Sequence, residues 1–413
     1  MTNSISRILI IGAGQAGAWA AHTLRQNGFD GELALVSNEE SVFYERPPLS
    51  KQVLAGQMDA AATQLFSTEA IEAMNIEWHK PDTAVAIDRT RKEVRLASGK
   101  LLSYDKLMLT TGSRARVPVK AWAEIDGVHT VRTIADAARL GAKLLPGRRL
   151  AIIGGGWIGL EVAATARKQG LDVVVFELGE RLCARSVAPQ VSDFLYQLHS
   201  DQGVDVRLSC GAIDLAGAAD GAVRVSAAGA VAGLFDAVVV GAGAEIASEL
   251  GREAGLDTTS GLVVDACGKT SDADIYAAGD VAIHPELGYC IQSWANAQNQ
   301  AISAALSLLG QDRPYADVPW LWSDQYQCNI QILGAAGSGE GTDIRRVCGD
   351  NQQSFIRLDA EDRLESLIAV NDPKLIKLGK RWIKAGMKLP AEILADPAQN
   401  LMTLKPYGLI ARR

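Results

Sequence analysis

Two glycine-rich turns, each placed between an apolar strand and a helix, constrain the fold of this 413-residue chain more than any other feature. In the first, the apolar run 7–11 leads into Gly-Ala-Gly-Gln-Ala-Gly at residues 12–17 and then into a helical stretch, residues 18–26. A strand without polar alternation is typical of a parallel sheet covered on both faces. Residues 32–36 form the next apolar run, so this segment predicts a βαβ unit that binds a dinucleotide.

The glycines of the first turn have separate tasks. Gly12 permits the sharp turn, Gly14 lets the backbone approach a pyrophosphate, and Gly17 lets the helix pack closely on the strand. An acidic residue usually follows the second strand and binds the ribose. Here that strand is followed by Ser-Asn-Glu-Glu, in which Asn38 stands where the contact is expected and Glu39 is the competing candidate. A solvated loop is the alternative for both residues.

A second glycine-rich turn repeats the pattern later in the chain. The apolar run 149–153 leads into Gly-Gly-Gly-Trp-Ile-Gly, a helical stretch at 160–169 and another apolar run at 173–176. The glycines of the turn include Gly154, Gly156 and Gly159. The repeat predicts a second dinucleotide-binding unit in the same chain.

The residue after the last of these runs indicates which nucleotide is bound. It is Glu177, whose carboxylate can accept hydrogen bonds from both ribose hydroxyls of NAD and would repel a 2′-phosphate. This favours NADH over NADPH. Arg181 and Arg185 follow closely and weaken the preference, because a basic side chain can accept a phosphate.

A stiff loop and a helical carboxylate supply a candidate catalytic pair. Residues 44–51 read Tyr-Glu-Arg-Pro-Pro-Leu-Ser-Lys, and the two prolines restrict the backbone just before Lys51. Glu161 lies near the start of the second motif's helix. In the functional interpretation, Glu161 pairs with Lys51 and positions it to favour charge on a reduced flavin ring. The alternatives are an exposed lysine and a glutamate that complements the helix dipole.

Two short segments complete this layout. The apolar run 107–109 ends in Thr-Thr-Gly, and residues 274–280 read as a short strand followed by small residues and Asp280. Small residues let the backbone approach a cofactor, and Asp280 can accept a hydrogen bond from a ribityl hydroxyl. The alternative for this second segment is an ordinary turn.

Charge, hydropathy and cysteine spacing exclude several classes of protein. The net charge of −7 argues against nucleic acid as the main partner. No apolar run reaches the length of a membrane span, so we expect a soluble, cytoplasmic protein without a membrane partner. The six cysteines form no CxxC or CxxxxC pair and have no metal-site or cluster spacing. No metal is expected, and electrons must therefore leave from a bound organic cofactor.

Together these pieces resemble the glutathione-reductase-like flavoproteins, and most of all the NADH:ferredoxin reductases of bacterial Rieske ring-hydroxylating dioxygenases and cytochromes P450. The resemblance covers nearly the whole chain. It rests on the segments 44–51, 154–161, 278–280, 293–298 and 319–325. It implies an α/β fold with two Rossmann-like dinucleotide-binding domains and a C-terminal α+β domain. The implied domains are a split FAD domain (1–113 and 245–318), an NADH domain (114–244) and a flavin-covering domain (319–413).

The resemblance also implies a set of cofactor contacts. FAD contacts are implied at Gly12, Gly14, Gly17, Asn38, Arg46, Lys51, Ala84, Arg132, Asp280 and Trp294. NADH contacts are implied at Gly154, Gly156, Ile158, Gly159, Glu161, Glu177 and Gly243. Asn38 departs from the family's usual acid, and the charge of Glu245, next to the Gly243 segment, is unexplained. Trp322 is a candidate wall of the flavin, with core packing as its alternative.

The missing cysteine pair distinguishes this sequence from the disulfide reductases of the same superfamily. Disulfide reductases of this superfamily carry CxxxxC on the flavin side, whereas residues 41–51 hold no cysteine. The implied reaction is transfer of a hydride from NADH to FAD and then of single electrons to a separate [2Fe–2S] ferredoxin of plant or Rieske type. Such a ferredoxin serves a terminal oxygenase that hydroxylates an aromatic ring.

A basic segment near the C-terminus predicts a docking surface. Residues 373–388 contain six basic side chains and no acid. At 100° per residue these side chains fall on one stripe, which would attract an acidic ferredoxin. The stripe consists of Lys374, Lys377, Lys380, Arg381, Lys384 and Lys388. A solvated helix face is the alternative.

Three rival functions remain open at this point. A reductase for rubredoxin or a P450 redoxin uses the same chemistry. A non-catalytic flavin redox sensor similar to apoptosis factors is a different class, and it would reduce carriers slowly. A dithiol reductase is opposed by the cysteine spacing.

Overall fold

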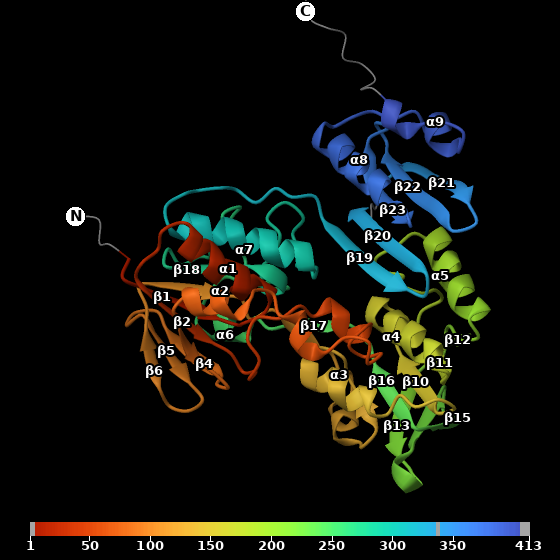
Figure 1. Cartoon of the computed structure of the whole chain (residues 1–413), viewed down its shortest axis with the longest axis horizontal. Coiled ribbons are helices and arrows are strands. Elements are labelled where there is room, and N and C mark those ends of the chain that lie inside the picture. Colours follow the sequence, from red (N-terminus) through yellow and green to blue (C-terminus); the bar gives the residue numbers. More distant parts are fainter. Residues whose placement is uncertain (1–4, 336–338, 405–413) are drawn as a thin grey trace, which may run out of the picture. The chain divides into compact units, whose positions relative to one another are not determined.

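The computed structural model describes residues 5–335 and 339–404. Contacts within it divide the chain into two compact units, each assembled from several segments of the sequence (Figure 1). Unit 1 comprises the residues up to Pro47, Asp59–Arg114 and Ala244–Asp317. Unit 2 comprises Pro48–Met58, Ala115–Gly243 and the described residues from Val318 onward. The division into an FAD domain, an NADH domain and a C-terminal domain stays a prediction, since these units do not reveal which ligand each one binds.

A five-stranded parallel sheet forms the centre of unit 1, with the order β18-β7-β1-β2-β3. The strands are β1 (Arg7–Ile11), β2 (Glu32–Val36), β3 (Ile76–His79), β7 (Lys106–Leu109) and β18 (Ile275–Ala277). β18 comes from the last segment of the unit and pairs with β7. The first dinucleotide-binding unit is therefore completed only by residues far along the chain.

Side chains of β1 alternate between two apolar layers, as expected for a strand covered on both faces. Ile8 and Ile10 pack with helices α1 and α7, which lie side by side (Figure 1). Leu9 and Ile11 pack toward the antiparallel sheet β4-β5-β6. These elements are α1 (Gln15–Gln26), α7 (Trp294–Leu308), β4 (Ala84–Asp88), β5 (Glu93–Leu96) and β6 (Leu101–Ser103).

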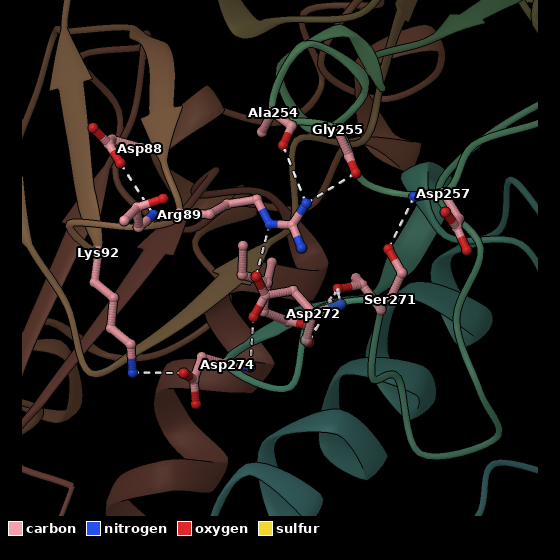
Figure 2. A network of polar contacts seen from close by, with 12 residues as sticks. Asp88, Arg89, Lys92, Ala254, Gly255, Asp257, Ser271, Asp272 and Asp274 are labelled. Carbon is pink, nitrogen blue, oxygen red and sulfur yellow. Dashed lines mark hydrogen bonds and ion pairs between the residues drawn. The ribbon is translucent and has the colours of Figure 1, made fainter.

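A polar network ties the β4–β5 hairpin to the last segment of unit 1 (Figure 2). Arg89 Nε donates to Asp272 Oδ2 at 2.7 Å, and its Nη1 donates to the carbonyl oxygen of Gly255 at 3.0 Å. Lys92 Nζ lies 2.5 Å from Asp274 Oδ2. Asp272 and Asp274 are partly buried, so these ion pairs are screened less than fully exposed ones. The network links segments that the sequence separates by most of unit 2.

Unit 2 contains a second five-stranded parallel sheet, with the order β12-β11-β10-β16-β9. The strands are β9 (Val128–His129), β10 (Arg149–Ile153), β11 (Asp172–Phe176), β12 (Asp205–Arg207) and β16 (Ala237–Val240). Leu150 and Ile152 pack on the side of α3 and α4, whereas Ala151 and Ile153 pack toward the sheet β13-β14-β15. These elements are α3 (Ile134–Gly141), α4 (Trp157–Lys168), β13 (Ile213–Gly217), β14 (Val223–Ala227) and β15 (Ala230–Phe235). The three-layer plan of unit 1 is thus repeated.

The C-terminal part of unit 2 is an antiparallel sheet with the order β19-β20-β23-β22-β21. Its strands are β19 (Trp320–Gln325), β20 (Cys328–Gly334), β21 (Gly341–Gly349), β22 (Gln352–Asp359) and β23 (Leu364–Val370). One apolar cluster joins this sheet to α8 and α9, and another joins it to α5. The helices are α5 (Pro189–Asp201), α8 (Pro373–Lys384) and α9 (Ala391–Ala395).

The remaining elements are short. They are α2 (Thr68–Ala73), α6 (Glu249–Glu253), β8 (Ser113–Ala115), β17 (Ala244–Ile246) and six 3₁₀ turns at 47–50, 60–63, 120–124, 219–221, 279–281 and 401–403. No helix in the described part of the chain is long and apolar enough to cross a membrane. The predicted α/β class, with two Rossmann-like units and a C-terminal α+β region, is confirmed.

Both helices that follow the glycine turns begin earlier than the sequence predicts. α1 begins at Gln15 instead of residue 18, and α4 begins at Trp157 instead of residue 160. Gly14 and Gly156 occupy the N-cap positions, so the last residues of each glycine motif already form the first helical turn. The unpaired N–H groups of these first turns are the groups that bind a pyrophosphate.

Candidate functional site

The first glycine turn has the shape of a nucleotide cradle. A Cβ atom on Gly12 would lie 2.3 Å from the carbonyl oxygen of Thr110, and one on Gly17 would lie 1.9 Å from that of Gly12. By contrast, a Cβ atom on Gly14 would have no atom within 4 Å. Two glycines are therefore required by packing inside unit 1. The space beside Gly14 is open, as binding of a pyrophosphate requires.

The second turn repeats these features within unit 2. A Cβ atom on Gly154 would lie 2.6 Å from the carbonyl oxygen of Gly241, and one on Gly159 would lie 2.3 Å from that of Gly154. At Gly156 the nearest such atom is 4.0 Å away. The residues of both turns fit a bound dinucleotide.

Lys51 and Glu161 form the ion pair that the sequence interpretation expected. Lys51 Nζ lies 2.7 Å from Glu161 Oε2, with 10% of the lysine side chain and 3% of the glutamate side chain exposed. Both residues belong to unit 2, because segment 48–58 packs with that unit. A buried ion pair is stable only when further hydrogen bonds compensate for lost hydration.

Those hydrogen bonds come from residues that sequence reasoning missed. Ser50 Oγ donates to Glu161 Oε2 at 2.5 Å, and Ser323 Oγ donates to Glu161 Oε1 at 2.6 Å. Thr165 Oγ1 donates to the carbonyl oxygen of Ser50 at 2.8 Å, which fixes the backbone beside Lys51. Ser323 lies on β19, within the segment 319–325 that carries the resemblance, but a contact with Glu161 was not predicted for it.

Asn38 and Glu39 differ in their surroundings at the end of β2. Asn38 is exposed. Glu39 accepts hydrogen bonds from Tyr44 Oη at 2.5 Å and Arg46 Nη2 at 2.7 Å. Burial acts to lower the pKa of Arg46, but Tyr44, Glu39 and Asp280 outweigh it and hold that pKa above its ordinary value. Glu39 is therefore engaged in a charged network, whereas Asn38 faces solvent.

Asp280 lies in a crowded backbone turn of unit 1. Its Oδ2 accepts a hydrogen bond from Ser113 Oγ at 2.7 Å. The preceding Gly279 has a φ angle of +82°, and its N–H donates to Gln300 Oε1 at 2.9 Å. A Cβ atom on Gly279 would lie 2.9 Å from that of Ala16, so a glycine is needed where this turn approaches α1.

Glu177 closes the second glycine turn. Its two carboxylate oxygens accept hydrogen bonds from the backbone N–H groups of Gly155 at 2.6 Å and Gly179 at 2.7 Å. Each oxygen retains capacity for another donor. Arg181 donates to the carbonyl oxygens of Val187 and Ala184, at 2.7 and 2.8 Å, so its guanidinium is used within its own loop.

The other NADH candidates lie in the first turn of α4 and in the loop after β16. Ile158 is 45% exposed, so its side chain is accessible to a ligand. Gly243 has a φ angle of +99°, and its ideal Cβ position lies 3.2 Å from Arg185 Nη2. Glu245, whose charge the sequence left unexplained, pairs with Arg114 Nε at 3.0 Å.

The tryptophan candidates lie in different units. In unit 1, Trp294 Nε1 donates to Glu45 Oε1 at 3.2 Å. In unit 2, Trp322 stacks on Trp320, with ring centroids 5.2 Å apart and an interplanar angle of 23°. Glu45 was missed by sequence reasoning, although it lies in the Tyr-Glu-Arg-Pro-Pro segment that was singled out.

Two further predicted FAD contacts, Ala84 and Arg132, lie in different units. Ala84 begins β4 in unit 1 and is partly buried. Arg132 precedes α3 in unit 2, and its backbone N–H donates to Asp136 Oδ2 at 3.1 Å. Their contacts with FAD remain predictions.

The basic stripe is formed largely as expected on α8. Leu375, Leu378 and Trp382 are buried, which turns the charged residues outward. Lys374, Lys377, Arg381 and Lys384 are exposed, while Lys380 is partly covered and lies 4.7 Å from the ring centroid of Trp320.

The placement of Lys388 on this helix was wrong. α8 ends at Lys384, and Gly386 adopts a φ angle of +55°, so the helical angle does not extend to Lys388. Lys388 instead forms an isolated bridge with Arg363. Gly386 is the sequence signal that indicates this end, because glycine commonly ends a helix in the left-handed conformation.

The six cysteines, all within the described residues, are free thiols. Burial raises the pKa of Cys183 to about 12 and that of Cys290 to about 11. A raised pKa keeps a thiol protonated at neutral pH and so lowers its reactivity as a nucleophile. The described residues also contain no group of three or more His, Cys, Asp or Glu side chains suited to hold a metal ion.

Comparison with known proteins gives two family matches. Residues 6–301 match the model described as pyridine nucleotide-disulphide oxidoreductase. Residues 320–405 match the model described as reductase C-terminal. The two matches follow one another along the chain and together include every candidate residue named above.

Individual relatives match over nearly the full chain. A p-cumate 2,3-dioxygenase system ferredoxin–NAD(+) reductase component from Pseudomonas putida is 39% identical, covering 96% of this chain and 98% of the relative. An anthranilate 1,2-dioxygenase system ferredoxin–NAD(+) reductase component from Burkholderia cepacia is 39% identical, covering 97% and 99%. Among solved structures, the reductase of a covalent putidaredoxin reductase–putidaredoxin complex superimposes with a TM-score of 0.90 at 33% identity, covering 95% and 96%.

Proposed function

The chain belongs to the pyridine nucleotide-disulphide oxidoreductase family, and we propose that it is an FAD-dependent NADH:ferredoxin reductase of a multicomponent oxygenase. Its electron acceptor in this proposal is a separate [2Fe–2S] ferredoxin, which in turn supplies an oxygenase that hydroxylates an aromatic ring. One observation carries the proposal: the chain keeps both dinucleotide cradles and a buried Lys51–Glu161 pair but has no cysteine in segment 41–51. The full-length similarity to two ferredoxin–NAD(+) reductase components supports the same assignment.

FAD, when bound, supplies the chemistry that connects two-electron donors such as NADH with one-electron acceptors such as iron–sulfur proteins. The protein's contribution is to orient the reactants and to place charge. Glu161 holds Lys51 with its ammonium group in one position inside a nearly dry environment. In such an environment a fixed positive charge stabilises developing negative charge more strongly than it would in water. We assign Lys51 as the catalytic residue and Glu161 as the group that positions it.

Binding of FAD is assigned to the first cradle. Gly12, Gly14 and Gly17 shape the turn, and Asp280 and Trp294 lie in the same unit. Asn38 is preferred to Glu39 as the ribose contact, because Glu39 is engaged by Arg46 and Tyr44. Arg46, Ala84, Arg132 and Trp322 are the further FAD contacts of this proposal.

Binding of NADH is assigned to the second cradle. Gly154, Gly156 and Gly159 shape this turn, and Glu177 is held by the backbone N–H groups of Gly155 and Gly179, which fix its charge beside the turn. A fixed carboxylate disfavours the 2′-phosphate of NADPH. The engagement of Arg181 with backbone carbonyls removes one of the two basic side chains that opposed this preference. Ile158, Glu161 and Gly243 complete the proposed NADH contacts.

Docking of the ferredoxin is assigned to the outer face of α8. Exposed lysine and arginine side chains gather there on a chain whose net charge is −7. A local positive surface on an acidic protein attracts an acidic partner and raises the association rate. We also place the protein in the cytoplasm, where NADH is available and free thiols stay reduced.

The proposal is tested by steady-state turnover with purified acceptors. NADH oxidation is measured with a plant-type [2Fe–2S] ferredoxin, a Rieske-type ferredoxin, a P450 redoxin and a rubredoxin. The proposal expects one of the first two to give the highest kcat/KM. Turnover with none of the four would contradict it and would favour a flavin redox sensor.

The second candidate is a reductase for a P450 redoxin. The structural similarity to the reductase of the putidaredoxin reductase–putidaredoxin complex favours it specifically. The same panel separates the two candidates, because this alternative expects the redoxin to have the highest kcat/KM.

A further inference from the structure

Beyond the Lys51–Glu161 pair, a continuous chain of buried hydrogen bonds runs through unit 2. Ser323 Oγ, which donates to Glu161, accepts a hydrogen bond from Gln325 Nε2 at 3.0 Å. Gln325 Oε1 lies 2.8 Å from His199 Nε2, and His199 Nδ1 lies 3.2 Å from Tyr326 Oη. The chain thus joins α4, β19, α5 and the turn after β19.

Three residues of this hydrogen-bond chain are buried more completely than the ion pair itself. Ser323, Gln325 and His199 are each 0% exposed, and Tyr326 is partly buried. Ser323 and Gln325 are two positions apart on β19, so they project from the same face of the strand. A row of buried polar groups in a small domain is costly unless every member is paired. Within this row each group has its partner.

The hydrogen bonds of this series all run in the same direction. Because Gln325 presents its oxygen to His199, the imidazole must carry its proton on Nε2 and accept at Nδ1, which leaves the Tyr326 hydroxyl as the donor to Nδ1. Burial lowers the pKa of His199 to about 4, although the hydrogen bond with Gln325 opposes this, so the ring is neutral at pH 7. Every N–H and O–H bond of the chain therefore points toward the carboxylate of Glu161.

We propose that His199, Gln325 and Tyr326 are positioning residues, which act through Ser323 to hold Glu161 in the rotamer that fixes Lys51. The inference rests on the proposed function, since it explains how the catalytic lysine of that reaction is kept in place. Aligned hydrogen bonds polarise one another, so the last donor binds the carboxylate more strongly than an isolated serine would. Loss of any member should loosen Glu161, with an effect that declines with distance along the chain.

The first test measures the midpoint potential of the bound FAD in the full-length protein, without ferredoxin. In Ser323→Ala the ratio of affinities for reduced and oxidised FAD should fall about tenfold, which corresponds to a potential about 30 mV lower for a two-electron couple. Gln325→Leu and Tyr326→Phe should give progressively smaller shifts in the same direction. Gln353→Leu, on strand β22 of the same sheet, is the matched control and should not change the potential.

Rescue separates hydrogen bonding from packing. His199→Leu should lower the potential, whereas His199→Gln, whose amide nitrogen can replace Nε2 as the donor to Gln325, should restore most of it. Equal losses in these two variants would overturn the proposal. Tyr326→Phe removes only a hydroxyl, so it keeps the proposal testable if larger changes unfold the protein.

Nitrogen-15 spectra of His199 supply a readout independent of the cofactor's chemistry. The wild-type ring should be a neutral Nε2–H tautomer at pH 7, and Tyr326→Phe should shift the signal of Nδ1 alone. A protonated ring or the opposite tautomer would overturn the chain's direction. If the wild-type protein reduces no ferredoxin, the proposed function fails. The spectra and potentials still test the hydrogen-bond series from Tyr326 to Glu161 in that case. If ferredoxin is reduced and all variants keep the wild-type potential of FAD, the proposed positioning role of the hydrogen-bonded residues fails while the proposed function stands.

Discussion

The two glycine cradles share a backbone and differ in the side chains around it. In both, the N–H of the first glycine donates to the last carbonyl of the neighbouring strand, at 2.9 Å for Gly12 and 2.8 Å for Gly154. Two positions after the third glycine, the first cradle has Trp19 and the second has Glu161. Trp19 packs against His22 and Phe66, whereas Glu161 binds Lys51. The similar glycine patterns of the two turns thus say little about the chemistry around each turn.

The cradles also differ after the second strand. In the sheet registers, Ile11 lies opposite Val36 and Ile153 lies opposite Phe176, so the counterpart of Glu177 is Ser37. The Ser37 hydroxyl accepts a hydrogen bond from the N–H of Glu39 at 3.1 Å. The second cradle therefore holds a fixed carboxylate at the position where the first holds the Ser37 hydroxyl. We relate this difference to the two nucleotides, NADH in the second cradle and FAD in the first.

The largest effect is expected where the two cradles are alike. Gly17→Ala and Gly159→Ala would place a Cβ atom within 2.3 Å of a carbonyl oxygen, so each should lower the free energy of unfolding of its unit by about 3 kcal/mol. Gly14→Ala places its Cβ in open space and should weaken FAD binding without that loss. Chemical unfolding after removal of FAD, together with FAD titration, measures both effects. Equal free energies of unfolding of Gly14→Ala and Gly17→Ala would contradict the different roles assigned to these two glycines.

A second prediction concerns Glu161, which has no counterpart in the first cradle, and its partner Lys51. Lys51→Met and Glu161→Gln should each slow reduction of FAD by NADH about 100-fold, because the fixed charge is lost or displaced. Stopped-flow absorbance under anaerobic conditions measures this rate. Lys143→Met, an exposed lysine of the same unit, is the control and should keep the wild-type rate. A wild-type rate in Lys51→Met would remove the catalytic assignment.

A third prediction concerns nucleotide choice. Glu177→Ala should lower the ratio of kcat/KM for NADH to that for NADPH about tenfold, or ~1.4 kcal/mol. The physical reason is the loss of hydrogen bonds to the ribose and of repulsion toward the 2′-phosphate. Steady-state kinetics with both nucleotides measures the ratio. An unchanged ratio would show that the fixed carboxylate does not select the nucleotide.

A fourth prediction concerns the docking face. The double variant Lys377→Glu and Lys384→Glu should lower kcat/KM for ferredoxin about fivefold at low ionic strength, and the difference should shrink in high salt. Reduction of FAD by NADH should stay at the wild-type rate. Lys120→Glu provides a charge-reversed control elsewhere on unit 2. A loss that is independent of salt would point to misfolding of α8.

The smallest effect is expected at Asn38, the ribose contact proposed for the first cradle. Asn38→Asp should tighten FAD binding about threefold, since a charged acceptor binds a ribose hydroxyl more strongly than an amide does. Glu40→Gln, an exposed neighbour, is the control. Fluorescence titration of the apoprotein with FAD measures both. Weaker binding of FAD in Asn38→Asp would favour Glu39 as the ribose contact.

Much of the fold could be predicted because it is encoded locally. The apolar runs 7–11, 32–36 and 149–153 coincide with β1, β2 and β10. Helix starts were placed late, because the glycine motifs themselves supply the first helical turn. The end of α8 was missed although Gly386 marks it. Local signals of this kind are present in the sequence even where they were misread.

The surroundings of the site could not be predicted in the same way. Glu161 is held by Ser50 and Ser323, and His199 is joined to Gln325 across 126 residues. No spacing rule links these residues, since the contacts arise only when β19 and α5 pack in unit 2. Serine, glutamine and histidine are also common in ordinary loops and helix faces. Sequence patterns therefore identified the Lys51–Glu161 pair but not the residues that support it.

The most direct test of the account follows electrons from NADH to an iron–sulfur protein without thiols. The enzyme is treated with an alkylating agent until its accessible cysteines are blocked, then mixed anaerobically with one equivalent of NADH and excess [2Fe–2S] ferredoxin. The account predicts two ferredoxins reduced per NADH at the rate of the untreated enzyme. Loss of ferredoxin reduction after alkylation, with FAD reduction by NADH intact, would contradict it.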